Sequence, residues 1–293
     1  MVDGVVAISS SKKALSWVPF LRGRLFSKHH PHIKSPAFVV ATLTGTIALL
    51  LGSPTVHARS CQSELQHTQA SIKRVVDGDT VELANGQKVR IIGINTLELN
   101  AKNASDKRMA ARANSALQAL LTDKQVTLAA GRDRKDRYGR LLAHIKLANG
   151  RDVAAELIHQ GLAIAVGVGR NTACATKNMD LERQSRNRQR GVWASRGDWW
   201  SVNEPRLTRA SGFRLISSTV IATTLKGRKS GLRMANGLQL VPSSTWPLNA
   251  KKTEELFVAL DQQGIEVRGW MGRGGASPTL KLHHPANVQL VSR

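Results

Sequence analysis

Acidic residues are scarce in this sequence, which carries 20 Asp and Glu against 43 Lys and Arg and has a net charge of +23. The positive excess is spread along the chain, with its largest share in the middle. A surface this basic favours polyanionic partners, nucleic acid above all, because binding them releases condensed counterions. The alternative is a basic protein that its charge keeps soluble. A hydrophobic content of 41% is ordinary for a globular protein with a real core.

Long hydrophobic runs are also lacking, apart from one near the amino terminus. Residues 37–52 (AFVVATLTGTIALLLG) carry no charge, but a membrane-spanning helix usually needs about 20 such residues. A basic segment precedes this run, and Val56-His57-Ala58 after it fits the cleavage pattern of a secretory signal. We therefore expect an exported protein, periplasmic or secreted, with Ala58 the last residue removed. The alternative is that 37–52 stays as a membrane anchor.

Cysteine is nearly absent, and both cysteines, Cys61 and Cys174, follow the predicted cleavage site. They lie too far apart in the sequence to form a zinc site by themselves. In an exported protein an even pair favours a disulfide over two free thiols. Closing a loop of about a hundred residues would stabilise the fold by roughly 4–5 kcal/mol in the chain-entropy model.

The length of 293 residues suits about two domains. The composition shifts after Trp193, and the residues up to Asn203-Glu204-Pro205 are typical of a linker. We therefore expect a signal peptide or signal anchor at 1–58, a first domain at 59–197, and a linker with a smaller domain at 198–293.

One stretch, RVVDGDTVELANGQKVRIIGINTLELN at 74–100, combines strand patterning with many polar residues. Two runs of alternating apolar residues flank Ala84-Asn85-Gly86, which predicts a β-hairpin with an Asn-Gly corner. A strand that only packs would not collect polar side chains at its ends. We therefore take this stretch as a candidate active site, with the polar residues Asp77, Asp79, Arg90, Asn95, Thr96 and Glu98.

The rest of the first domain alternates between strand and helix patterns. Apolar spacing predicts helices at about 107–121, capped by Ser105-Asp106, at 152–160, closed by Gly161, and at about 177–190. A short strand is expected at 126–129, a loop at 131–140 and another strand at 141–147. Five strands with short connections favour an α+β, mainly β fold: a five-stranded OB-type barrel with three helices.

The carboxy-terminal segment is rich in short strand patterns. Strands are expected at 215–224, 238–241, 265–271, 279–282 and 288–291, with one helix near 251–262, which predicts a small β-rich, OB-like domain. His283-His284 raises the question of a metal site. Neighbouring residues on a strand point to opposite faces, so a surface position is favoured.

The blocks DGDTVEL, VRIIGINTLE, DRYGRLLA and LIHQGLA follow one another in this order, with GVW at the end. Over about residues 70–196 this order resembles the staphylococcal-nuclease-like (thermonuclease) family. The resemblance implies a five-stranded OB barrel with three helices, in agreement with the pattern of elements. It also implies the family activity, hydrolysis of phosphodiester bonds in DNA and RNA, commonly with calcium.

Phosphodiester hydrolysis needs a nucleophilic water, stabilisation of the charge that develops around phosphorus, and groups that hold the phosphate. Glu98 is the candidate general base; the alternative is a solvated carboxylate at a strand end. Arg90 and Arg140 are the candidates for the phosphate, because the guanidinium fork matches its geometry. Arg90 lies within the apolar run VRIIGI, where an unpaired charge is costly. We therefore expect it to pair with Glu98 or with the substrate phosphate.

Calcium prefers several oxygen ligands. The resemblance implies that Asp79 supplies a carboxylate, Asn95 a side-chain oxygen and Thr96 its backbone carbonyl, with Asp77 in support behind them. Asn95 stands where the best-known pattern has Asp, which removes one negative charge, so we expect weaker calcium binding or another ion preference. Leu97 replaces the usual proline and loosens the turn that carries Glu98.

The loop DRYGR adds two candidates for substrate binding, Arg137 and Tyr138, the only tyrosine in the chain. The alternative for Tyr138 is a packing residue at the barrel rim. The family often places tyrosines against the nucleotide base after QGLA. Here the segment Val166-Gly167-Val168-Gly169 has none, so we expect base stacking there to be lost.

We conclude from the sequence that the chain is an exported nuclease acting on DNA, RNA or both with little sequence specificity. In this hypothesis Glu98, Arg90 and Arg140 act beside a divalent cation, with calcium as the expected ion. The alternative is a nucleic-acid-binding OB-fold module that the changes at Asn95 and Leu97 have left with little catalysis. A third hypothesis is a purely structural protein of the cell envelope, which would have no affinity for DNA at low salt. The basic charge and the ordered motifs argue against it.

Overall fold

The computed structural model describes residues 61, 66–121, 125–194, 197, 200–202, 212–271 and 278–291. The predicted signal at 1–58, with the run at 37–52, lies outside these residues. No helix in the described part of the chain is long and apolar enough to cross a membrane. From residue 57 onward the chain is one compact unit.

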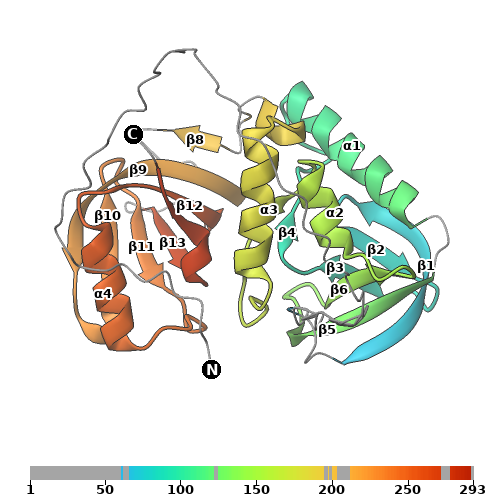
Figure 1. Cartoon of the computed structure of the whole chain (residues 1–293), viewed down its shortest axis with the longest axis horizontal. Coiled ribbons are helices and arrows are strands. Elements are labelled where there is room, and N and C mark those ends of the chain that lie inside the picture. Colours follow the sequence, from blue (N-terminus) through green and yellow to red (C-terminus); the bar gives the residue numbers. More distant parts are fainter. Residues whose placement is uncertain are drawn as a thin grey trace, which may run out of the picture. The chain divides into compact units, whose positions relative to one another are not determined.

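Five strands of the first domain close into a barrel in the order β1-β2-β3-β6-β5 (Figure 1). They are β1 (His67–Asp77), β2 (Thr80–Leu83), β3 (Lys88–Ile91), β5 (Gln125–Lys135) and β6 (Leu141–Leu147). Alternate apolar residues such as Val81, Val89 and Ile145 are fully buried and fill the interior. The predicted five-stranded barrel is confirmed.

The hairpin between β2 and β3 has the predicted Asn-Gly corner. Gly86 has a φ of +82°, a conformation that glycine adopts without a steric penalty. The Leu83 amide donates to the Gln87 carbonyl at 2.8 Å, which closes the hairpin. Thr80 pairs with Arg90 across the two strands, so the end of the hairpin fixes which polar residues face one another.

The three predicted helices of this domain are α1 (Ala104–Leu120), α2 (Val153–His159) and α3 (Ala175–Asn187). The predicted cap of α1 was wrong. Asn103 caps the helix, because its side-chain oxygen accepts from the Ser105 amide at 2.7 Å, and Ser105 lies within the first turn. Helix α2 ends, as expected, before Gly161, whose φ is +69°.

The prediction of a loop from residue 131 was also wrong. Strand β5 continues to Lys135, which pairs with Leu141 of β6. The charged residues that suggested a loop, Arg132, Arg134 and Lys135, are exposed on the extended strand. The turn itself is confined to the residues between β5 and β6.

The second β-rich region is a seven-stranded sheet, here called the C-terminal sheet, in the order β13-β11-β10-β9-β12-β14, with β8 paired to β9 (Figure 1). Its strands are β8 (Trp200–Val202), β9 (Gly212–Thr224), β10 (Gly231–Met234), β11 (Gln239–Pro242), β12 (Gly264–Met271), β13 (Thr279–Leu282) and β14 (Val288–Leu290). Helix α4 (Ala250–Leu260) packs on it through the fully buried Phe257. The predicted β-rich region with one helix is confirmed, although Trp200–Val202, placed in the linker, is a strand.

Three short 3-10 helices complete the described elements: η1 (Gly191–Ala194), η2 (Gly227–Lys229) and η3 (Pro285–Asn287). The predicted disulfide is present between Cys61 and Cys174, with the two Cα atoms 5.2 Å apart. It ties the segment before β1 to the amino-terminal end of α3.

Candidate active site

The polar residues of 74–100 come together where β1, β2 and β3 meet a short two-stranded sheet. That sheet pairs β4 (Ile94–Asn95) with β7 (Ile164–Ala165) and lies off the barrel. Asp79 sits between β1 and β2, and its carbonyl accepts from the Ile91 amide at 2.9 Å. The barrel therefore fixes Asp79 and Arg90, and the residues after β3 are held by these two side chains and by the β4–β7 pair.

Arg90 is the most heavily bonded of these side chains. Its Nη2 lies 3.1 Å from Asp79 Oδ2 and donates to Asn95 Oδ1 at 3.0 Å. Its Nη1 donates to the backbone carbonyls of Ile91 and Ile94, each at 3.1 Å. Both terminal nitrogens are thus engaged within the protein, which leaves Nε as the donor without a protein partner among the described residues.

The three predicted ion ligands lie in the same buried network. Asp79 Oδ2 accepts from the Thr96 amide at 3.3 Å, and Asp79 Oδ1 accepts from the Thr80 hydroxyl at 2.9 Å. Asn95 Nδ2 donates to the Thr96 carbonyl at 3.0 Å. Asp79, Asn95 and Thr96 are each less than a tenth exposed. The network brings one carboxylate and two neutral oxygens together.

These three groups offer the type of oxygen ligand that a hard cation prefers, but only one of them carries a negative charge. Carboxylate, amide and carbonyl oxygens are the ligands that calcium prefers. However, Asn95 Oδ1 already accepts from Arg90, and the Thr96 carbonyl accepts from Asn95. Among the described residues no cluster of three or more His, Cys, Asp or Glu has an arrangement that could hold a metal ion. The residues therefore fit a weakly bound cation that shares its oxygens with protein donors.

Glu98 differs from its neighbours because its side chain is exposed and has no hydrogen-bond or ion-pair partner among the described residues. Arg90 pairs with Asp79, which corrects the expectation that it would pair with Glu98. Partial burial raises the pKa of the Glu98 carboxyl, and the carboxylates of Asp77 and Asp79 raise it further. Arg90 and Arg140 act in the opposite direction without restoring the ordinary value. An unpaired carboxylate with a raised pKa is suited to accept a proton.

Asp77 lies beside this group at the end of β1. Burial raises the pKa of its carboxyl, while its hydrogen bond from the Gly78 amide, 2.7 Å long, lowers it. A Cβ at Gly78 would stand 2.9 Å from both Thr96 Oγ1 and Ala113 Cβ, so a larger residue would displace the turn that carries Thr96. Asp77 therefore lies next to the point where the end of β1 packs closely against α1 and against Thr96 of the site.

Arg140 reaches the same region from the turn between β5 and β6. Its Nε donates to Asp136 Oδ2 at 2.7 Å, and its Nη1 donates to the Thr80 hydroxyl at 3.2 Å. Its Nη2 has no protein partner among the described residues, and the side chain is 27% exposed. Arg140 therefore has donors available for a phosphate that Arg90 lacks.

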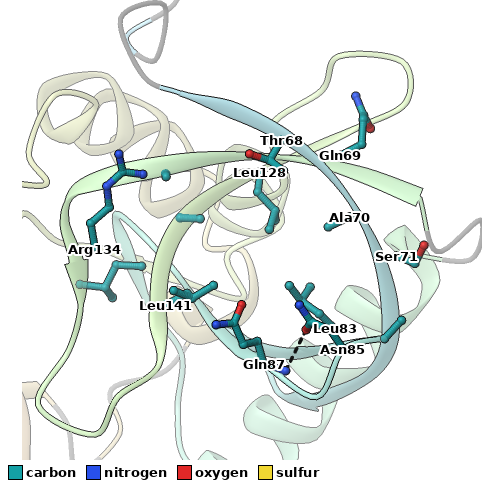
Figure 2. Close-up of a pocket in the computed structure, with 14 residues that line it drawn as sticks. Thr68, Gln69, Ala70, Ser71, Leu83, Asn85, Gln87, Leu128, Arg134 and Leu141 are labelled. Atoms are coloured by element: carbon teal, nitrogen blue, oxygen red, sulfur yellow. Dashed lines mark hydrogen bonds between the residues drawn. The ribbon is translucent and has the colours of Figure 1, made fainter.

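A cavity of about 440 Å³ lies elsewhere on the barrel, lined by residues of β1, the β2–β3 turn, β5 and β6. Figure 2 shows its apolar lining, which includes Leu83, Leu128 and Leu141. None of the predicted site residues lines it. The residues of the candidate site therefore lie outside the lining of this cavity.

A family model described as Staphylococcal nuclease homologue matches residues 88–195. The match spans the segment from β3 to η1 and includes Arg90, Asn95, Thr96, Glu98 and Arg140. Residues 88–195 are therefore similar to this family. The C-terminal sheet lies beyond the matched residues.

Similar curated proteins include two thermonucleases and an endonuclease. The thermonuclease of Staphylococcus intermedius is 29% identical over 125 residues, which cover 42% of this chain and 74% of the relative. The thermonuclease of Staphylococcus hyicus is 29% identical over 126 residues, or 42% and 73%. Endonuclease YhcR of Bacillus subtilis (strain 168) is 28% identical over 156 residues, or 49% and 12%. These relatives support a nuclease function for the staphylococcal-nuclease-like domain.

Asp136 is a residue of the first domain that sequence reasoning did not single out. Its carboxylate accepts from Arg140 Nε, from the Tyr138 amide at 2.8 Å and from the Arg140 amide at 3.1 Å. Burial would raise the pKa of this carboxyl, but these hydrogen bonds outweigh burial and hold it below the usual value. The available signal in the sequence was an aspartate two residues before Tyr138 and three before Gly139, a pattern in which the aspartate side chain commonly accepts from the amides of the turn.

Tyr138 projects from this turn and is 68% exposed, so the alternative of a packing residue is not supported. Arg137 Nη2 donates to its hydroxyl at 2.8 Å, and the Arg137 guanidinium lies 4.8 Å from the ring centroid. The two residues predicted to bind substrate thus form an exposed, cationic and aromatic tip beside Arg140.

His283 and His284 are partly exposed, and both also contact the segment 167–169. His283 Nδ1 accepts from the Gly169 amide at 3.3 Å, and a Cβ at Gly167 would stand 3.1 Å from His284 Cβ. Asn287 clamps Gly167 by accepting from its amide at 2.9 Å and donating to its carbonyl at 2.7 Å. These contacts are far apart in the sequence, so strand periodicity could not reveal them.

Proposed function

We propose that this protein is an exported nuclease that hydrolyses phosphodiester bonds of DNA, RNA or both with little sequence specificity. The observation that carries the proposal is Glu98, an unpaired carboxylate with a raised pKa, placed near Arg140 in a domain of a nuclease family. The net charge of +23 supports a polyanionic substrate. The Cys61–Cys174 disulfide supports export, because disulfides persist in oxidising compartments.

In this mechanism Glu98 takes a proton from the attacking water while the water oxygen forms its bond to phosphorus. Arg140 donates from its unpaired Nη2 to the phosphate oxygens, where negative charge grows as the bond to the leaving oxygen breaks. Arg90 holds Asp79 and Asn95 in place and offers Nε to the phosphate. Arg137 and Tyr138 contact the neighbouring substrate residues. Preformed donors of this kind commonly contribute a factor of about 10²–10³ each.

A divalent cation, calcium in the first instance, would be held by the Asp79 carboxylate, Asn95 Oδ1 and the Thr96 carbonyl. When bound, it would supply positive charge beside the phosphate and neutralise the surrounding carboxylates. Asp77 stands behind these ligands as a further negative charge. The amide of Asn95 leaves the site with one negative charge fewer than a second carboxylate would give, so we expect loose binding.

The second candidate function is a nucleic-acid-binding module with little catalysis. It is favoured by the engagement of both terminal nitrogens of Arg90 within the protein, which leaves that residue few donors for a phosphate. This function would keep the basic surface and the exposed Arg137–Tyr138 tip.

One experiment separates the two functions. The purified protein is incubated with single-stranded DNA and with RNA, in calcium, in other divalent ions and in EDTA, and both cleavage and binding are measured. The nuclease proposal predicts cleavage that EDTA abolishes and a divalent ion restores. Binding without cleavage under every ionic condition would overturn it in favour of the binding module.

A further inference from the structure

The segment 94–98, here called the site turn, carries Asn95, Thr96 and Glu98. Arg90 and Asp79 hold its first three residues, through hydrogen bonds to the Ile94 carbonyl, the Asn95 side chain and the Thr96 amide. Its only strand, β4, has two residues and pairs with β7 alone. The Glu98 carboxylate has no partner among the described residues, so the backbone of the site turn alone decides where it lies. Whatever holds β7 therefore contributes, together with Arg90 and Asp79, to the position of the proposed general base.

Two ionised side chains hold β7 on the side that does not face β4. The Ala165 amide donates to Glu182 Oε2 at 2.7 Å, and Arg268 Nη1 donates to the Ala165 carbonyl at 3.0 Å. Ala165 is the residue that pairs with Ile94 at the start of the site turn. Glu182 belongs to α3 of the nuclease domain, whereas Arg268 belongs to β12 of the C-terminal sheet.

Arg268 is itself fixed by an ion-pair cluster that joins both parts of the chain. Its Nη1 lies 2.7 Å from Glu182 Oε2, and its Nη2 lies 3.1 Å from Glu266 Oε1. Arg186 pairs with both acids, at 2.9 Å to Glu182 and 2.6 Å to Glu266. The Arg268 side chain is fully buried, so this cluster of two arginines and two glutamates is balanced in charge and sheltered from salt.

An apolar cluster joins the site turn to the same sheet. Leu97, the residue directly before Glu98, is 6% exposed and packs in a cluster with Phe213 and Leu215 of β9. The ring of Phe213 packs in a T-shaped arrangement with the ring of Trp270 on β12, with the ring centroids 5.1 Å apart. The sheet thus approaches the site turn from two directions: through β7 by ionic hydrogen bonds, and at Leu97 by packing.

We propose that β9 and β12 of the C-terminal sheet position the site turn, with Arg268 and Phe213 as positioning residues that hold this turn and so set the place of Glu98. This inference rests on the proposed nuclease function. A reacting group displaced by about 1 Å can cost about 10²-fold in rate. Arg140, which in the proposed mechanism binds the phosphate, is anchored instead in the β5–β6 turn by Asp136. Loosening the site turn should therefore lower kcat and leave KM nearly unchanged.

The test compares four variants of the full chain cutting single-stranded DNA. Arg268→Lys keeps the charge of the cluster but loses the forked donors that reach Glu182, Glu266 and the Ala165 carbonyl together. Phe213→Leu removes the aromatic ring from the apolar cluster that includes Leu97. Arg233→Lys, at an exposed position on β10, and Phe257→Leu, in the core of the same sheet, are the matched controls.

We expect Arg268→Lys and Phe213→Leu to lower kcat by about 10- to 100-fold with KM within about threefold, and the two controls to keep kcat. Equal losses in all four variants would mean that the sheet matters only for general stability, which would overturn the inference. Unchanged kcat in both positioning variants would overturn it as well.

Amide hydrogen exchange provides the second measurement, which does not depend on activity. Arg268→Lys should speed exchange in 162–166 and in the site turn, with the amides of β1 and β5 unchanged. Unchanged exchange in the site turn would overturn the inference even if kcat fell. If the wild-type protein cleaved nothing, the proposed function would fail by itself, and exchange would still decide whether Arg268 holds the turn.

Discussion

Arg90 and Arg140 carry the same guanidinium group in different surroundings. Arg90 is 13% exposed and has both terminal nitrogens bonded to the protein, whereas Arg140 is 27% exposed and keeps Nη2 for a ligand. The sequence placed both at the phosphate because guanidinium chemistry suits it. Only the structure separates them, since the partner of Arg90 depends on how β2, β3 and β4 meet.

Substitutions at the two arginines should therefore have different consequences. Arg90→Met leaves Asp79 buried without its ion pair, so we expect the free energy of unfolding to fall by about 3–5 kcal/mol. Arg140→Met should lower kcat/KM by at least about tenfold with a much smaller loss of stability. Urea unfolding and steady-state kinetics measure both quantities. Equal losses of stability would contradict the distinction.

The pKa of Glu98 gives a prediction for the acid side of the pH profile. Its carboxyl has a pKa raised above 4.5 by burial and by neighbouring carboxylates. A general base works only when deprotonated, so kcat/KM should fall as pH drops through this raised pKa. We expect the midpoint of that fall to lie above 4.5 when rates on single-stranded DNA are followed from neutral to acidic pH. A rate that stays constant down to 4.5 would rule out Glu98 as the titrating base.

At the scale of elements, the sequence predicted what depends on local pattern. Alternation and the Asn85-Gly86 corner predicted β2 and β3, and apolar spacing predicted three helices. The cap of α1 was missed because Asn103 and Ser105 are both good capping residues, and only the geometry shows that Asn103 has the extended backbone of a cap. The end of β5 was missed because its exposed charged residues resemble a loop.

The corrected cap can be tested by substitution. Asn103→Ala removes the oxygen that accepts from the Ser105 amide, so we expect the free energy of unfolding to fall by about 1 kcal/mol. Ser105→Ala, in the first turn, is the matched control and should change it by less than about 0.5 kcal/mol. Chemical unfolding measures both. A larger loss of stability in Ser105→Ala than in Asn103→Ala would instead identify Ser105 as the cap.

At the scale of the whole molecule, the contacts that shape the site join segments far apart in the chain. Arg268 reaches Ala165, and His283 reaches Gly169, from a sheet whose strands looked independent in the sequence. The spacing of apolar residues and the residues typical of turns indicate local structure only. They identified the catalytic candidates but not the contacts that these residues' supports make with the C-terminal sheet. The recognised motifs end at Trp193, before that sheet begins.

The disulfide also acts at this scale, because it closes a loop with a sequence separation of 113. Replacing both Cys61 and Cys174 by serine frees that loop in the unfolded chain. We expect the free energy of unfolding to fall by about 2–5 kcal/mol. Urea denaturation of the oxidised wild type and the double variant gives the comparison, and an unchanged midpoint would show that the bond contributes nothing to stability.

The central claim is that Glu98 is the base of a nuclease, and Glu98→Gln tests it most directly. The amide keeps the size of the side chain but cannot take a proton from water, so kcat on single-stranded DNA should fall by about 10²–10⁴-fold while DNA affinity stays the same. Glu255→Gln, at an exposed position on α4, is the control and should keep full activity. A Glu98→Gln variant that cleaves DNA at the wild-type rate would contradict the account.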